Sequence, residues 1–188
     1  MKKTYLLLTG LILLSISSFA QGTIDLTVKW NATASKYEVY AKPTFTSSTF
    51  TWGTSQISVV VPAATPDAAL TLVSVNAGGW STVNQIFAPT ADTAHDFHSV
   101  ISSGQATALT SGQETLLFTF TLSDGLCRDG VRLFVNGSDP SSSAAGMKGG
   151  DFQNSIDNGL ITDVYRANYS NTGTSCSTCN ITAPELVK

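Results

Sequence analysis

The chain has 188 residues, of which 42% are hydrophobic and 12% are charged, and its formal net charge is −3. A chain of this length suits one domain with a substantial core. The sparse charge and slightly acidic balance lack the basic surface that a nucleic-acid partner requires, so we expect none.

The first twenty residues have the pattern of a secretory signal peptide. Two lysines follow Met1, an apolar run covers residues 5–16, and the small residues Ser18 and Ala20 precede the expected cut. The apolar run is shorter than the roughly 20 residues that a membrane-spanning helix needs. We therefore expect a signal peptide over 1–20, no membrane span in the mature chain, and a secreted protein of the periplasm, the cell surface or the extracellular space.

Alternating apolar and polar residues predict β-strands along the mature chain. The first two, at 24–30 and 37–41, are expected to form a hairpin, and the strongest alternation, at 116–122, predicts a central strand. Further strands are expected at 50–52, 57–61, 70–75, 85–88, 96–101, 131–135 and 160–169. No segment keeps a period near 3.6 residues.

This pattern predicts an all-β domain over residues 21–169. Short strands separated by Gly, Pro, Ser and Asn favour an antiparallel β-sandwich, jelly-roll or immunoglobulin-like, with about nine strands. A flexible C-terminal tail is expected over 170–188.

Three cysteines remain in the mature chain, at Cys127, Cys176 and Cys179. In an oxidising compartment, Cys127 is expected to form a disulfide with either Cys176 or Cys179. The Cys-x-x-Cys spacing of the last two lies in a Ser/Thr/Asn-rich tail and lacks the α/β setting of a redox motif.

The segment 136–159 is the strongest candidate for a site outside the strands, because connections this long are uncommon in compact domains. Its oxygen-bearing side chains suit a hard cation, and calcium is the natural candidate. The proposed ligands are Asn136, Asp139, Asp151 and Asp157. The alternative is that these residues only stabilise turns, as Asn, Asp and Gly commonly do.

Large aromatic side chains suggest a second kind of site, a platform on which a sugar ring stacks. Most aromatic residues of a sandwich lie in its core. Tyr40 is the main exception, since its face of the predicted strand also carries Glu38 and Lys42, and Trp80, directly after Gly78 and Gly79, is the second.

Catalytic patterns are absent from the sequence. His95 and His98, the two histidines, would point to opposite faces of a strand and so would not share a zinc ion. No serine has the Gly-x-Ser-x-Gly pattern of a nucleophile elbow. We therefore expect no enzyme activity and no catalytic residues.

Several motifs resemble known families of secreted modules. Residues 112–120, a small turn followed by alternating apolar residues, resemble a late strand of cohesin-like and carbohydrate-binding-module-like sandwiches. A wider set of motifs resembles modules of large surface proteins from gliding bacteria that use type IX secretion: Gly79-Trp80, residues 116–122, Cys127, residues 131–134, 136–140 and 149–152. The resemblance implies an adhesive or scaffolding module.

These observations favour an exported, non-catalytic interaction or adhesion module whose partner is a protein. The alternative is a carbohydrate-binding module for a polysaccharide, with Tyr40 or Trp80 as the stacking residue and calcium as a possible stabiliser of the long loop.

Overall fold

The computed structural model describes residues 22–75, 79–160 and 162–177, and these residues form β-strands and no helix. Accordingly, the described part of the chain contains no helix long and apolar enough to cross a membrane. The predicted signal peptide at 1–20 and Cys179 lie outside the described residues.

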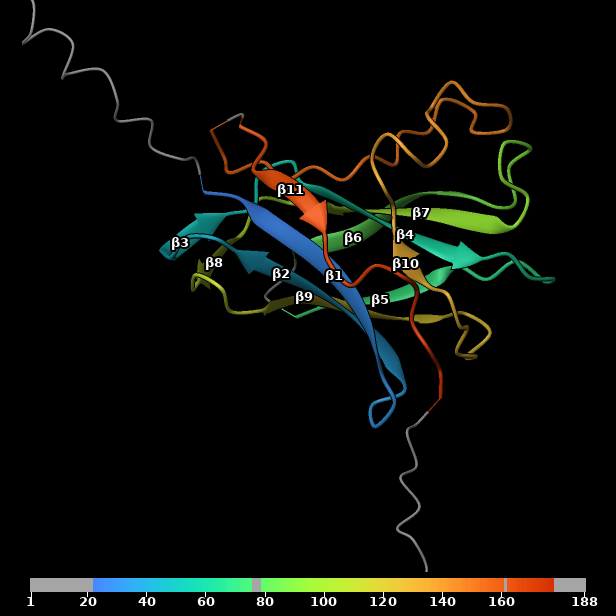
Figure 1. The fold of residues 1–188 in the computed structure, drawn as a ribbon, viewed down its shortest axis with the longest axis horizontal. Coiled ribbons are helices and arrows are strands. Elements are labelled where there is room, and N and C mark those ends of the chain that lie inside the picture. The colour runs from blue at the N-terminus through green and yellow to red at the C-terminus, as the bar shows by residue number, and fades with distance from the viewer. Residues whose placement is uncertain (1–21, 76–78, 161, 178–188) are drawn as a thin grey trace, which may run out of the picture.

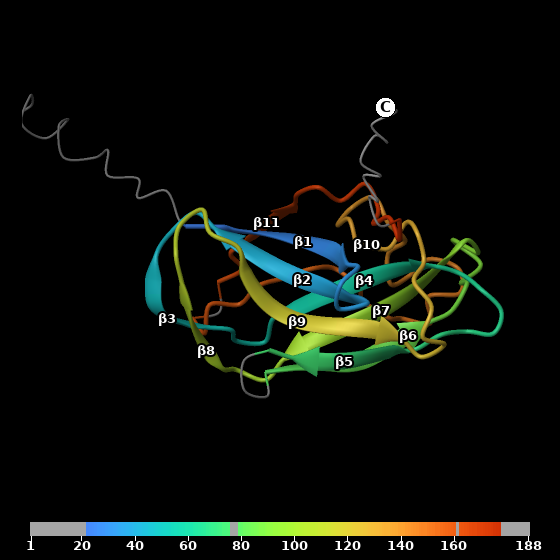
Figure 2. The same cartoon turned by 90° about the horizontal axis from the view of Figure 1, so that it is seen from below.

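Eleven strands are arranged in three sheets, and the two larger sheets face each other (Figures 1 and 2). The five-stranded sheet has the order β11 (Tyr165–Asn168), β1 (Ile24–Asn31), β2 (Lys36–Pro43), β9 (Thr115–Leu122) and β5 (Leu70–Ser74). The four-stranded sheet has the order β10 (Arg132–Leu133), β4 (Gln56–Pro62), β7 (His95–Ser102) and β6 (Trp80–Ile86). A small sheet pairs β3 (Ser47–Thr51) with β8 (Ala106–Leu109) at one end of the molecule (Figure 1).

The pairings confirm the all-β sandwich, with eleven strands in place of about nine. β1 and β2 form the predicted hairpin, and β9 lies between β2 and β5, as expected of a central strand. All the pairs are antiparallel except β1 with β11, which is parallel. The strand that the alternation misses, β8, has only four residues, of which one, Leu109, is buried.

Apolar side chains fill the space between the two large sheets. The alternation of β1 and β2 places Ile24, Leu26, Val39 and Ala41 in this core with no exposed surface. Burial of such side chains stabilises the fold by about 1.5–3 kcal/mol each. The sandwich is therefore held mainly by the strands whose alternation is clearest in the sequence.

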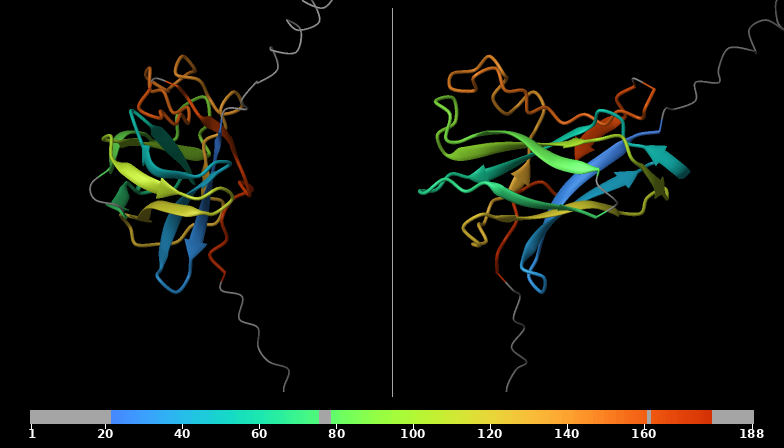
Figure 3. Two further views of the ribbon diagram at one scale, coloured as in Figure 1. Left: turned by 90° about the vertical axis from the view of Figure 1, so that its left-hand side faces the viewer. Right: turned by 180° about the vertical axis from the view of Figure 1, so that it is seen from behind.

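A second, smaller core covers the opposite face of the four-stranded sheet. Val60 of β4 and Phe97 of β7 point away from the main core and pack against Phe134, Met147 and Phe152. The last three belong to the segment between β10 and β11, drawn in orange along one side of the sandwich (Figure 3). The long connection is thus a packed layer with its own apolar anchors.

The segment after β11 lies on the sandwich instead of forming the predicted flexible tail. The Asn171 side chain bonds both the N–H and the C=O of Leu133, and the backbone of Thr174 bonds Val131 and Gly130. Cys176 forms a disulfide with Cys127, with 5.8 Å between their Cα atoms. The tail prediction thus fails for residues 171–176, while 178–188 lie outside the described residues.

Candidate functional site

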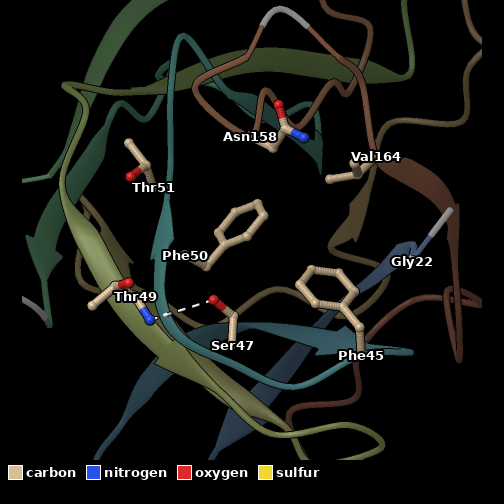
Figure 4. Close-up of a pocket in the computed structure, with 8 residues that line it drawn as sticks. All are labelled: Gly22, Phe45, Ser47, Thr49, Phe50, Thr51, Asn158 and Val164. Atoms are coloured by element: carbon tan, nitrogen blue, oxygen red, sulfur yellow. Dashed lines mark hydrogen bonds between the residues drawn. The ribbon is translucent and has the colours of Figure 1, made fainter.

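A hollow of about 310 Å³ lies at the end of the sandwich where the small sheet meets the start of β1, and we call it the β3 hollow (Figure 4). Its lining residues are Gly22, Phe45, Ser47, Thr49, Phe50, Thr51, Asn158 and Val164. The volume lies at the lower end of the range for small-ligand sites, roughly 300–1,000 Å³.

Three distant parts of the chain build the walls of the hollow. β3 and the residue Phe45 before it form one side. Asn158 and Val164 form another, and Gly22 forms the third. Backbone bonds from Gly53 N–H to the Asp157 carbonyl and from Ile24 N–H to the Val164 carbonyl, both 2.8 Å, hold the second part in place. Backbone pairing with the core strands therefore fixes the walls.

Two phenylalanines supply the apolar part of the hollow. Phe50 is buried and its ring centroid lies 5.7 Å from that of the half-buried Phe45. Phe50 in turn contacts Trp52 edge-on at 4.9 Å, so the pair is anchored to the main core. Gly22 approaches Phe45 so closely that a Cβ there would lie 2.4 Å from the ring, and a larger residue would displace it.

Polar groups line the rest of the hollow (Figure 4). The Ser47 hydroxyl accepts a bond from the Thr49 N–H at 3.3 Å, and the Asn158 Oδ1 accepts one from the Leu160 N–H at 2.9 Å. Within the described residues, the hydroxyls of Thr49 and Thr51 and the Asn158 amide nitrogen make no hydrogen bond. These groups are donors and acceptors that a ligand could use.

No charged side chain lines the hollow. The nearest carboxylates in sequence are already engaged, since Asp157 accepts a bond from the Gly159 N–H and Asp163 accepts bonds from Ile156 and Tyr165. The site thus combines an aromatic surface with neutral hydrogen-bonding groups.

Tyr40 lies half-buried on the outer face of the five-stranded sheet, but its polar and aromatic groups are already in use. Its hydroxyl donates to Glu38 at 2.6 Å, and the Lys29 ammonium lies 5.0 Å from its ring centroid. Burial, followed by the bond to Glu38, raises the pKa of Tyr40 to about 12.

Tyr169, near Tyr40, also has its hydroxyl bonded to a glutamate and its ring next to a lysine. Its hydroxyl donates to Glu114, which is also paired with Lys29, and Lys42 lies over its ring. The two tyrosines and their charged neighbours therefore form a network that is satisfied internally, and they do not present an open platform.

Trp80 is not the exposed stacking residue that its position after two glycines suggests. It is 5% exposed and packs in the main core between Trp52 and Phe118, at centroid distances of 5.7 and 5.5 Å. The large apolar ring is placed inside because the alternation of β6 directs its first residue toward the opposite sheet.

The four predicted calcium ligands are separately engaged and are not brought together at one site. Asn136 exchanges two bonds with the backbone of Asn154, while Asp139 forms a two-pronged ion pair with Arg132, both of its bonds at 2.7 Å. Asp151 and Asp157 accept bonds from the backbone two residues ahead. Among the described residues, no three His, Cys, Asp or Glu side chains gather as a metal group. Asp151 and Asp157 therefore have the hydrogen bonds that are typical of turn residues.

Asn154 is a key residue of the long connection, although it is not among the four proposed calcium ligands. Only 1% exposed, its side chain accepts a bond from the Ser58 N–H of β4 and donates one to the Phe134 carbonyl, at 2.8 and 2.7 Å. It therefore fastens the connection to the outer face of the four-stranded sheet.

The two histidines have different surroundings. His95 pairs with Asp92 at 2.8 Å, while His98 is buried and faces a hollow between β5 and β6. Burial lowers the pKa of His98 to about 4, so the ring is neutral at pH 7. His98 is thus a core histidine, while the His95 side chain is 30% exposed.

Comparisons with protein-family models, curated proteins and solved structures found no match to this chain. The resemblance to cohesin-like and carbohydrate-binding-module-like sandwiches therefore stays a prediction, and the function has to be argued from the surface of this molecule alone.

Proposed function

We propose that this chain is an exported, non-catalytic interaction module that binds a protein partner along the free edge of its five-stranded sheet. The edge strand is β5, which pairs with β9 on one side and with no described strand on the other. An open sheet edge is a ready template for a strand from a partner protein.

The hydrogen-bond pattern supports this proposal. The N–H of Val75 bonds the Leu117 carbonyl and the N–H of Ser123 bonds the Ala69 carbonyl, so odd-numbered residues of this stretch face β9. Strand alternation therefore points the N–H and C=O groups of Leu70 and Leu72 away from the sheet. These groups are available to pair with an incoming strand.

Exposed apolar side chains are the observation that carries the proposal. Val73 on β5 and Val83 on β6 are 61% and 58% exposed, and Val75 follows β5. β5 and β6 are the neighbouring edge strands of the two large sheets (Figure 2). Exposed apolar side chains at neighbouring sheet edges are typical of a protein-interaction surface.

The test is capture from a cell-surface fraction with the purified chain and two single variants. Val73→Lys places a charge on the open edge, which disfavours strand pairing. Leu126→Lys is the matched control, because Leu126 is also exposed, at 64%, but lies outside the strands. We expect Val73→Lys to lose a partner that the wild type and Leu126→Lys retain; equal capture by all three would contradict the proposal.

Carbohydrate binding is the second candidate function. The observation that favours it is the β3 hollow, in which an aromatic pair and unpaired hydroxyl and amide groups occur without any charge. Its test is a binding screen of the wild-type chain against soluble polysaccharides, in which the absence of any binding would remove this candidate.

A further inference from the structure

We propose that the β3 hollow binds a neutral sugar unit, which stacks on Phe45 and bonds to Thr49, Thr51 and Asn158. The inference rests on the second function proposed above and specifies its site and ligand class. It differs from the sequence expectation, which places the sugar on Tyr40 or Trp80.

Phe45 supplies the apolar surface on which a sugar ring would stack. A sugar ring has faces of C–H groups that pack on aromatic rings, and a rigid aromatic surface loses little entropy when it binds. Phe45 is half-exposed on the hollow and is backed by Phe50 and, through it, Trp52. The ring is therefore both accessible and held in place.

The polar side chains of the hollow offer groups that have no hydrogen-bond partner among the described residues. Sugar hydroxyls both donate and accept, and they need partners of both kinds. The threonine hydroxyls supply either role, and the Asn158 amide nitrogen supplies donors, since its oxygen is occupied by the Leu160 N–H. Figure 4 shows these residues around the two phenylalanine rings.

The absence of charged side chains from the lining of the hollow favours a neutral sugar over an acidic one. No Lys, Arg, Asp or Glu lines the hollow, so a sulfated or uronic-acid unit would lose its hydration without gaining an ion pair. A neutral unit has no such cost. Tyr40, by contrast, has its hydroxyl on Glu38 and a lysine over its ring, so a sugar would have to displace existing contacts there.

The experiment measures binding of neutral and acidic soluble polysaccharides to the full chain and to three variants. Phe45→Ala removes the stacking ring. Asn158→Asp keeps the oxygen that accepts from Leu160 and removes the amide donors. Tyr40→Phe is the control outside the hollow, and melting curves establish that each variant is folded.

We expect the wild type and Tyr40→Phe to bind a neutral polysaccharide equally, and Phe45→Ala and Asn158→Asp each to weaken that binding about tenfold. Binding that both hollow variants leave unchanged would overturn the site while keeping the carbohydrate function. Preference for acidic polysaccharides would overturn the ligand class. A wild type that binds no polysaccharide would remove the carbohydrate function and this inference with it.

Discussion

His98 and Asp96 are buried titratable residues on β7, and each has one buried polar atom without a hydrogen-bond partner in the described residues. Burial lowers the pKa of His98 to about 4 and raises that of Asp96. Arg128 further lowers the pKa of His98 through its charge. The inner face of β7 therefore links the stability of the sandwich to pH.

Whether His98 raises or lowers stability as the pH changes follows from its pKa in the folded and unfolded chain. The unfolded chain takes up this proton near pH 6.5 and the folded chain near pH 4, so the unfolded state holds more protons in between. The stability contribution is therefore full above pH 6.5 and is lost as the pH falls to 4, by about 3 kcal/mol. The raised pKa of Asp96 acts in the opposite direction, since its contribution is lost as the pH rises.

The variant His98→Gln isolates the histidine, because it keeps a polar side chain and removes the titration. We expect the free energy of unfolding, measured by urea denaturation at pH 7 and 4.5, to fall less in the variant than in the wild type. The same pH dependence in the wild type and in His98→Gln would show that His98 is not the group responsible.

At the scale of the elements, the Cys127–Cys176 disulfide ties the segment after β11 to the loop before β10. The two cysteines are 49 residues apart in sequence, and closing a loop of this size stabilises a fold by about 2–4 kcal/mol. We expect Cys176→Ser to lower the free energy of unfolding by this amount, measured by chemical denaturation without reductant.

Cys179→Ser is the control that distinguishes the two pairings that the sequence leaves open. The Cys127–Cys176 bond leaves Cys179 out of the structural disulfide, so this variant should match the wild type. A loss of stability in Cys179→Ser, with none in Cys176→Ser, would assign the bond to the other pair.

The elements also show what the sequence could predict. Strands with one buried face, such as β1, β2 and β9, alternate clearly and were predictable. β6 was predicted only at its end, because residues between Trp80 and Ile86 are exposed and their sequence does not alternate. The sequence could not distinguish a calcium site from turns in the long connection, since the oxygen-bearing residues that bind a cation also stabilise turns.

The β3 hollow could not be predicted from local pattern. Phe45 and Asn158 lie far apart in the chain and meet only because backbone bonds join Asp157 to Gly53, after β3, and Val164 to Ile24 of β1. Phe45 alone resembles any core aromatic residue, and Asn158 alone resembles a turn residue. Only the pairing of distant segments brings these two side chains to one site.

At the scale of the whole molecule, contacts within the protein fasten the long connection to the sandwich. Its oxygens are bonded within the protein, and Phe134, Met147 and Phe152 anchor it to the four-stranded sheet. We therefore expect the melting temperature of the purified chain to be the same with added calcium and with chelator. A calcium-dependent increase would show that the connection has a cation site after all.

For the whole molecule, we propose that β5 is an open sheet edge available to a protein partner. Amide hydrogen exchange of the purified chain, resolved by residue, tests it most directly. We predict slow exchange at Thr71 and Val73, whose amides face β9, and faster exchange at Leu70 and Leu72, whose amides face outward. Equally slow exchange at all four positions would show that the edge is already covered, and it would contradict the proposal that β5 is open.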